Sequence, residues 1–181
     1  KIRKFMNLSD LEISYENESG ATISQKFLVP LLKECKLYRR LTYSFTSAAL
    51  KSWAGALASV IDKETEIEVL CDLTDVLSHD NQLKRALQIQ LDPNEKNRII
   101  EKHRDTIILD ALAFNVDQRN ISSRHKILDY LIAKGQLKVK FAYPKVFEDY
   151  LKQEDSHGPN PLYHKKLGYF MFSDDSKVAF V

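Results

Sequence analysis

The chain has 181 residues, 44% of them hydrophobic, so it can bury a substantial core, and its length favours a single domain. It carries 27 basic and 25 acidic residues, and the resulting net charge of +2 is too small to indicate a nucleic-acid partner by bulk electrostatics. Any phosphate-binding site must therefore be local.

Two cysteines, Cys35 and Cys71, lie in apolar segments, which fits buried, reduced thiols of a cytoplasmic protein better than a disulfide scaffold. No apolar run approaches the length of a membrane span, and the start of the chain lacks the apolar core of a signal peptide. The chain begins without methionine and ends on the apolar residues 178–181. We therefore expect a fragment of a longer protein, truncated at both ends.

The first part of the chain predicts a strand, a helix and a second strand in succession. Residues 1–24 are expected to form an arm or hairpin, and apolar positions at helical spacing predict a helix over 25–37. β-Branched and aromatic residues predict a strand at 40–45, followed by a helix over 46–60 and a strand over 66–71. This order indicates a βαβ unit with two parallel strands.

A helical insertion is expected around residues 78–115. Its first helix is capped by Ser78 or Asp80 and runs to about Leu91. Its second helix covers 93–114, because Asp92 and the proline after it have the pattern of a helix start.

A further helix is expected to begin at Ser122-Ser123 and to end at Gly135, and it leads into a strand over 137–143. The succession of strands and helices predicts an α/β domain with a mixed, largely parallel sheet flanked by helices. We expect this single domain to span residues 1–181.

The last twenty residues carry the clearest candidate site. A loop rich in glycine and proline, 154–161, leads into His164, and Lys166 follows at the start of an apolar strand. Side chains two apart on a strand point to the same face, so both would project into one site. A His-x-Lys tripeptide also arises by chance in roughly a fifth of chains of this length, so a polar strand entrance without a function is the alternative.

The segment 164–170, followed by a turn and the strand 177–181, resembles the His-x-Lys signature of the phospholipase D superfamily. It is closest to the nuclease-type domains at the head of bacterial helicase and restriction proteins. Segments 27–32 and 41–50 are similar to the opening helix and the strand and helix that follow it in these domains. The segment 127–140 resembles the helix and strand that precede their active-site strand. The resemblance implies a phospholipase D-like fold.

The chain departs from the family pattern in two places. The family has an aspartate five residues after the lysine, whereas this chain has Met171 there and acids only at Asp174 and Asp175. In the family the next strand runs into Gly-Ser-x-Asn, which helps to hold phosphate. Here that motif would begin after Val181, and we attribute its absence to truncation.

The resemblance implies a phosphodiesterase that needs no metal and no other cofactor. In the family a histidine attacks phosphorus to give a phosphohistidine, while a second histidine protonates the leaving oxygen and then activates water. His164 would be nucleophile or acid, and Lys166 would offset charge on the phosphoryl oxygens. The chain holds a single His-x-Lys, so the second copy would come from another protomer of a homodimer.

Three further side chains are candidates for substrate contact. His157 lies in the loop before the site, and Lys138 and Lys140 could follow a DNA backbone. As an alternative, strand lysines often only protect a solvated face. The sequence has no metal-ligand spacing and no glycine-rich phosphate loop, so neither a metal site nor an ATPase site is predicted. The remaining histidines are expected to be solvated or to cap helices: His79, His103 and His125.

The favoured hypothesis is the DNA-cutting nuclease domain of a restriction or phage-defence protein, with a covalently linked helicase region in the full-length chain. The alternative is a catalytically silent domain of the same fold, used for dimerisation or DNA docking. A lipid or phosphatidyl-transfer enzyme is disfavoured, because the chain has one motif and no evident interfacial apolar helix.

Overall fold

The computed structural model describes residues 23–72, 81–89, 92–101, 104–142 and 166–181. The arm or hairpin predicted for the N-terminal segment falls almost wholly outside these ranges. The candidate residues His157 and His164 also lie outside the described residues.

The helices in the described ranges are η2 (Ser24–Leu28), α2 (Val29–Glu34), η3 (Ser47–Ala49), α3 (Leu50–Trp53), α4 (Leu57–Lys63), α6 (Asn81–Ile89), α7 (Pro93–Ile100), α8 (Arg104–Val116) and α9 (Ile121–Ala133). The strands are β1 (Leu37–Leu41), β2 (Glu66–Asp72), β3 (Leu137–Ala142), β4 (Leu167–Met171) and β5 (Lys177–Phe180).

The strands of the described ranges form a five-stranded mixed sheet with the order β3-β2-β1-β4-β5. β1 and β2 are parallel, and β2 and β3 are parallel, so the predicted βαβ unit is confirmed. β4 runs antiparallel to β1, and β5 runs antiparallel to β4. The fold is thus α/β with a mixed sheet and flanking helices, as predicted, but two of its four described strand pairs are antiparallel, so the expectation of a largely parallel sheet was wrong.

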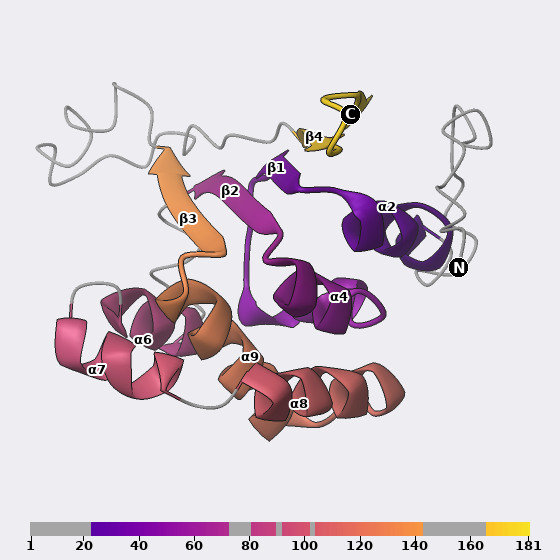
Figure 1. Cartoon of the computed structure of the whole chain (residues 1–181). Helices are drawn as coiled ribbons and strands as arrows, with labels where there is room; N and C mark the ends of the chain where they lie inside the picture. Colours follow the sequence, from indigo (N-terminus) through magenta and orange to yellow (C-terminus); the bar gives the residue numbers. More distant parts are fainter. Residues whose placement is uncertain (1–22, 73–80, 90–91, 102–103, 143–165) are drawn as a thin grey trace, which may run out of the picture.

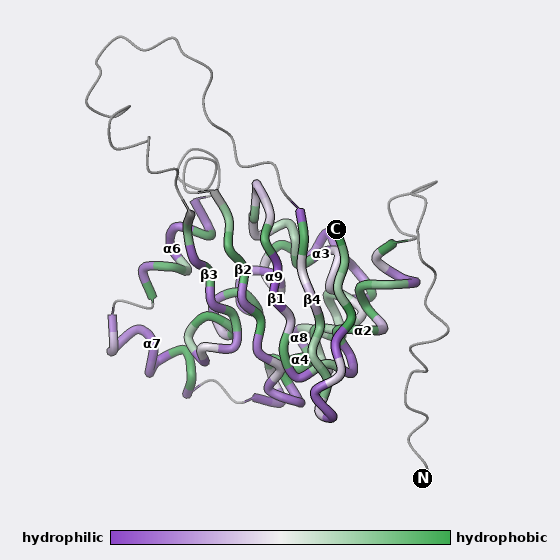
Figure 2. Tube along the Cα trace, turned by 90° about the horizontal axis from the view of Figure 1, so that it is seen from above, coloured by the Kyte–Doolittle hydropathy of each residue, from purple (hydrophilic) through white to green (hydrophobic). Residues whose placement is uncertain are grey.

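The described helices lie on one face of the sheet (Figure 1), which separates a helix-covered face from an open face. Seen from above the open face, the strands lie in front of the helices (Figure 2). Because side chains alternate along a strand, each strand sends every second residue to each face. Buried side chains on the helix-covered face include Tyr38, Ile67, Val69, Leu137 and Phe170.

Aromatic side chains fill the core beneath the helix-covered face. Tyr38 stacks on Phe170 with ring centroids 4.6 Å apart, and the fully buried Trp53 meets Tyr38 edge-on at 6.1 Å. Phe27 of η2 packs edge-on against Phe170 at 5.8 Å. Segments from both ends of the described chain therefore close one core around β1 and β4.

The strand predicted at 40–45 lies at Leu37–Leu41 instead. The prediction was wrong because Thr42 begins a turn, in which its hydroxyl donates to the carbonyl oxygen of Ser44 at 3.1 Å. Residues 43–45 leave the sheet although their side chains favour strands.

The helix predicted over 93–114 is two helices, α7 and α8. Its predicted start is confirmed, since Asp92 Oδ1 accepts from the backbone N–H groups of Asn94 at 2.9 Å and Glu95 at 3.3 Å. α7 packs against α6 and α9, whereas α8 packs against α4 and α9. Tertiary packing sets such a break, and no glycine or proline marks it in the sequence.

Two other predicted helices are also interrupted. The helix predicted over 25–37 is η2 followed by α2, and it ends at Cys35, whose ψ of 154° is extended. The helix predicted over 46–60 is divided into η3, α3 and α4. Gly55 lies between α3 and α4, and a Cβ there would lie 3.1 Å from Val29 Cγ1 of α2.

α9 begins after Asn120 rather than at Ser122-Ser123. Asn120 Oδ1 accepts from the backbone N–H of Ser123 at 3.1 Å, so the amide caps the helix and Ser123 is buried in its first turn. The end is as predicted, since Gly135 has a φ of 74°, in the left-handed region that glycine adopts freely.

Cys35 and Cys71 are buried free thiols, as predicted. The Cys35 thiol donates to the carbonyl oxygen of Leu32 with a sulfur to oxygen distance of 3.8 Å, and burial raises the pKa of Cys35 to about 12. In the described part of the chain, no helix is both long and apolar enough to cross a membrane.

Candidate functional site

The carboxyl ends of the parallel strands β1, β2 and β3 lie at one edge of the sheet, and β4 starts at this same edge. Leu167, the first residue of β4, pairs with Leu41, the last residue of β1. Lys166 directly precedes Leu167 and is exposed. α/β proteins commonly bind ligands in the crevice outside the carboxyl ends of their strands. The predicted lysine therefore lies at an edge suited to a ligand.

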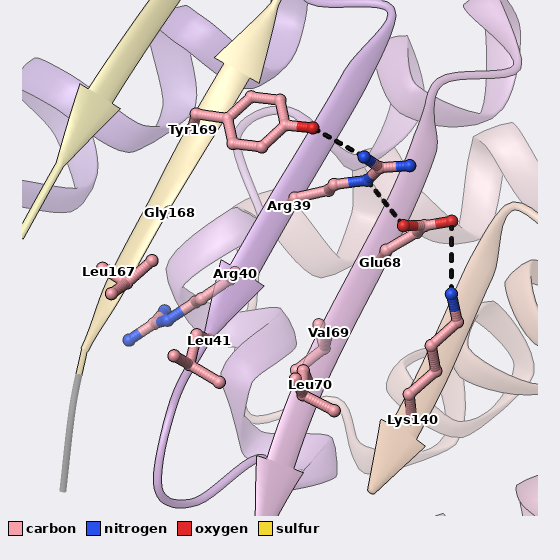
Figure 3. A pocket seen from close by; sticks show the side chains of 10 residues that line it. All are labelled: Arg39, Arg40, Leu41, Glu68, Val69, Leu70, Lys140, Leu167, Gly168 and Tyr169. Atoms are coloured by element: carbon pink, nitrogen blue, oxygen red, sulfur yellow. Dashed lines mark hydrogen bonds and ion pairs between the residues drawn. The ribbon is translucent and has the colours of Figure 1, made fainter. Parts of the chain in front are cut away.

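A pocket of about 480 Å³ lies on the open face next to this edge (Figure 3). Leucines from β1, β2 and β4 give it an apolar side, and charged side chains from β1, β2 and β3 give it a polar side. Its lining residues are Arg39, Arg40, Leu41, Glu68, Val69, Leu70, Lys140, Leu167, Gly168 and Tyr169. The pocket can thus contact both the apolar and the anionic parts of one ligand.

A hydrogen-bonded network crosses the polar side of the pocket. Arg39 Nε donates to Glu68 Oε2 at 2.6 Å, and Arg39 Nη1 donates to the Tyr169 hydroxyl at 2.7 Å. Lys140 Nζ lies 3.8 Å from Glu68 Oε1. The hydrogen bonds to Tyr169 and then to Glu68 raise the pKa of Arg39 above its ordinary value, so its guanidinium stays charged.

The two cations in this network are more exposed to solvent than Glu68, the acid with which they pair. The Glu68 side chain is 17% exposed, whereas the side chains of Arg39 and Lys140 are 48% and 62% exposed. An anion that approaches the open face therefore meets the two cations before it meets the carboxylate. Glu68 thus keeps two positive groups at the surface in fixed positions.

The predicted substrate lysines, Lys138 and Lys140, are both exposed on the open face of β3. Lys140 lines the pocket, whereas Lys138 Nζ pairs with Glu66 Oε2 at 3.2 Å, outside the pocket lining. The structure therefore brings Lys140 to the carboxyl edge that Lys166 also occupies. Lys138 lies two residues before Lys140, nearer the start of the same strand.

Arg40 reaches the pocket from the helix-covered side of β1. Its Nε is buried, and no acceptor for it is found among the described residues. Its guanidinium lies next to the Tyr38 hydroxyl, and burial raises the pKa of Tyr38 while the Arg40 charge opposes this shift. Arg40 thus adds a third positive side chain to the pocket, after Arg39 and Lys140.

Gly168 fixes how closely β4 approaches β1. A Cβ at this position would lie 2.4 Å from the carbonyl oxygen of Arg39 and 2.6 Å from Phe180 Cζ, closer than any real contact of this kind. Any larger residue would push β4 away from β1, and Lys166 with it. The glycine two residues after the lysine therefore has a packing role that positions the site.

Sequence reasoning missed Arg39, Glu68 and Tyr169. One signal was present: Glu68 and Lys138 each alternate with apolar residues on strands that were predicted correctly, and opposite charges on neighbouring strands tend to pair. Arg39 gave no such signal, because β1 was placed three residues too late in the chain, and Tyr169 gave none because its partner Arg39 lay outside the predicted strand.

Among the described residues, no group of three or more histidine, cysteine, aspartate or glutamate side chains could hold a metal ion. Comparisons of the chain with protein-family models, with curated proteins and with solved structures found no match. The resemblance to the phospholipase D superfamily therefore rests on the residues named above and stays a prediction.

Proposed function

We propose that this chain is a metal-independent phosphodiesterase that acts on DNA, as the phospholipase D-like nuclease domain of a restriction or phage-defence helicase protein. One observation supports this function most directly. Lys166 lies at the carboxyl edge of the parallel strands, next to a pocket lined by the cationic side chains of Arg39, Arg40 and Lys140. A phosphodiester has the charge and size to occupy such a place.

In the proposed reaction an imidazole nitrogen of His164 attacks phosphorus. A phosphorus–nitrogen bond forms and the bond to the leaving oxygen breaks, while the His164 of a second protomer donates a proton to that oxygen. Water then attacks phosphorus, the second imidazole accepts a proton from the water, and the phosphorus–nitrogen bond breaks. Lys166 offsets the negative charge on the phosphoryl oxygens in both steps.

A DNA-cleavage assay in excess metal chelator, called the chelator assay below, tests the proposed reaction. Full-length protein is incubated with DNA in excess chelator, and His164→Ala is expected to abolish cleavage that the unmodified protein retains. Lys166→Ala is expected to slow cleavage by about 10²–10³-fold, the usual loss on removing one group that stabilises transition-state charge.

The matched control is Lys96→Ala, which removes an exposed lysine from α7, in the helix layer. This variant is expected to cleave at the normal rate. Unchanged cleavage by His164→Ala would contradict the proposed role of this residue, and a purely monomeric protein at high concentration would contradict the shared site.

The second candidate is a catalytically silent domain of the same fold that docks on DNA or dimerises. Met171 favours it, because the residue stands where the family has aspartate and it pairs within the sheet with Leu37 and Lys177. A silent domain would retain DNA in a binding assay and would leave it uncut under every condition of the chelator assay.

A further inference from the structure

The open face of the sheet has the side chains of a binding surface rather than those of a solvated face alone. No described helix covers it (Figure 1), and it carries the aromatic ring of Tyr169 beside the guanidinium of Arg39 (Figure 3). Arg39 on β1 pairs in register with Tyr169 on β4, and Lys177 on β5 lies diagonally to Tyr169, two residues before its register partner Ala179. We call Arg39, Tyr169, Lys177, Lys138 and Lys140 the open-face set.

Tyr169 is held as a platform in the middle of this set. Its hydroxyl accepts from Arg39 Nη1 at 2.7 Å. The Arg39 guanidinium carbon and Lys177 Nζ each lie 5.8 Å from the centre of its ring, within reach of a cation–π attraction. Figure 3 shows the ring lying along the sheet, with its hydroxyl directed to Arg39. The ring is therefore fixed in place before any ligand arrives.

The positive charges of the open-face set extend across the whole sheet. They lie on β3, β1 and β5. Because neighbouring strands are about 4.8 Å apart, the distance from β3 to β5 is about 19 Å. Glu66 and Glu68 lie within the same face and are paired with lysines of β3, and Asp72 continues their alternation at the end of β2. The four cations of this face, Arg39, Lys138, Lys140 and Lys177, thus outnumber its three strand acids by one.

We infer that the open-face set binds single-stranded DNA, with an unpaired base stacked on Tyr169 and the phosphates on the surrounding cations. Base stacking on an aromatic side chain with cations along the backbone is how sheet surfaces bind single strands. A DNA duplex is a poorer ligand for this surface, because its bases are stacked inside the double helix. The ring of Tyr169 also lies along the sheet, so it does not project into a groove of the DNA.

This inference deepens the proposed function and rests on it for the direction of the strand, which would continue from Tyr169 past Leu167 to Lys166. These residues follow one another along β4 towards the carboxyl edge. The single strand would thus pass through the pocket before it reaches the predicted active site.

Substitution of Glu68 gives a second test, because the Glu68 carboxylate competes with phosphate for Arg39 and Lys140. Replacing it by glutamine keeps its shape and removes its charge. Glu68→Gln is therefore expected to tighten binding of single-stranded DNA several-fold, which a residue with a merely structural role would not do.

The test is fluorescence anisotropy with a labelled oligothymidylate, a matched DNA duplex and an oligouridylate. The full-length His164→Ala variant is used in excess chelator, so that binding is measured without cleavage. We expect it to bind the single DNA strand at least tenfold more tightly than the duplex. Tyr169→Leu, which keeps an apolar strand residue, is expected to weaken binding about tenfold, whereas Tyr169→Phe keeps the ring and most of the affinity.

Lys96→Ala is again the control and is expected to bind normally. The inference is overturned if the duplex binds as tightly as the single strand, if Tyr169→Leu binds normally while folded by circular dichroism, or if only the RNA binds. Its failure is distinguishable from that of the proposed function. Tyr169-dependent binding without any cleavage by the unmodified protein contradicts the phosphodiesterase alone, and cleavage with Tyr169-independent binding contradicts the single-strand site alone.

Discussion

The two faces of the sheet use the same strands for different purposes. Tyr38 and Arg39 are adjacent on β1, yet Tyr38 is fully buried against Phe170 and Trp53 whereas Arg39 binds Tyr169 on the open face. Alternation along the strand separates the residues that hold the fold from those available to a ligand. Substitutions on the two faces should therefore have separable effects on stability and on binding.

The largest expected effect comes from a matched pair of tyrosines. Tyr38→Ala removes a buried ring and should lower the free energy of unfolding by about 4 kcal/mol, as for other large aromatic residues in a core. Tyr169→Ala, on the open face, should lower it by about 1 kcal/mol or less. Urea denaturation followed by circular dichroism measures both, and equal losses would mean that the open face is covered in the intact protein.

A second pair of substitutions concerns glycine. Gly168→Ala places a Cβ against the backbone of β1 and should lower the free energy of unfolding by about 2 kcal/mol, the usual cost of overpacking. Gly135→Ala meets no atom within 4 Å, so it should cost only about 1 kcal/mol for its positive φ. The same denaturation assay compares them, and a smaller loss at Gly168 would contradict the close approach of β4 to β1.

The third prediction concerns pH. Burial raises the pKa of Cys35 from an ordinary value of 9.0 to about 12, so the folded protein holds this proton more tightly than the unfolded chain. The contribution of this proton to the free energy of unfolding is fully present below pH 9 and is lost as the pH rises towards 12. Between pH 8 and pH 10 the loss should be about 1 kcal/mol.

The control for this prediction is Cys35→Val, which has no titrating thiol. The fall in stability between pH 8 and pH 10 should be smaller in this variant by about the same 1 kcal/mol. An equally steep fall in both proteins would assign the pH dependence to other groups.

Local chemistry in the sequence predicted several parts of the fold. The cap at Asp92 and the end of α9 near Gly135 followed from residues that act within a few positions of one another. The parallel pairing of β1 with β2 followed from the order strand, helix, strand. Lys166 was also chosen from local spacing, to His164, and its role stays a prediction.

Long-range geometry was not predictable in this manner. The hydrogen bond between Arg39 and Tyr169 joins residues 130 positions apart, and it depends on the position of β1, which was predicted three residues too late. The break between α7 and α8 depends on which helices each one contacts. Such features arise from packing between elements, so periodicity and propensity give no sign of them.

The antiparallel insertion of β4 beside β1 has a consequence for synthesis of the chain. β1 is the middle strand of the described sheet, and one of its two neighbours is made only when the ribosome reaches residues 167–171. Until then one hydrogen-bonding edge of β1 has no native partner from β4, while Tyr38 lacks its stacking partner Phe170. A nascent chain at this stage exposes an unpaired strand edge, and shielding by a chaperone would matter most in that interval.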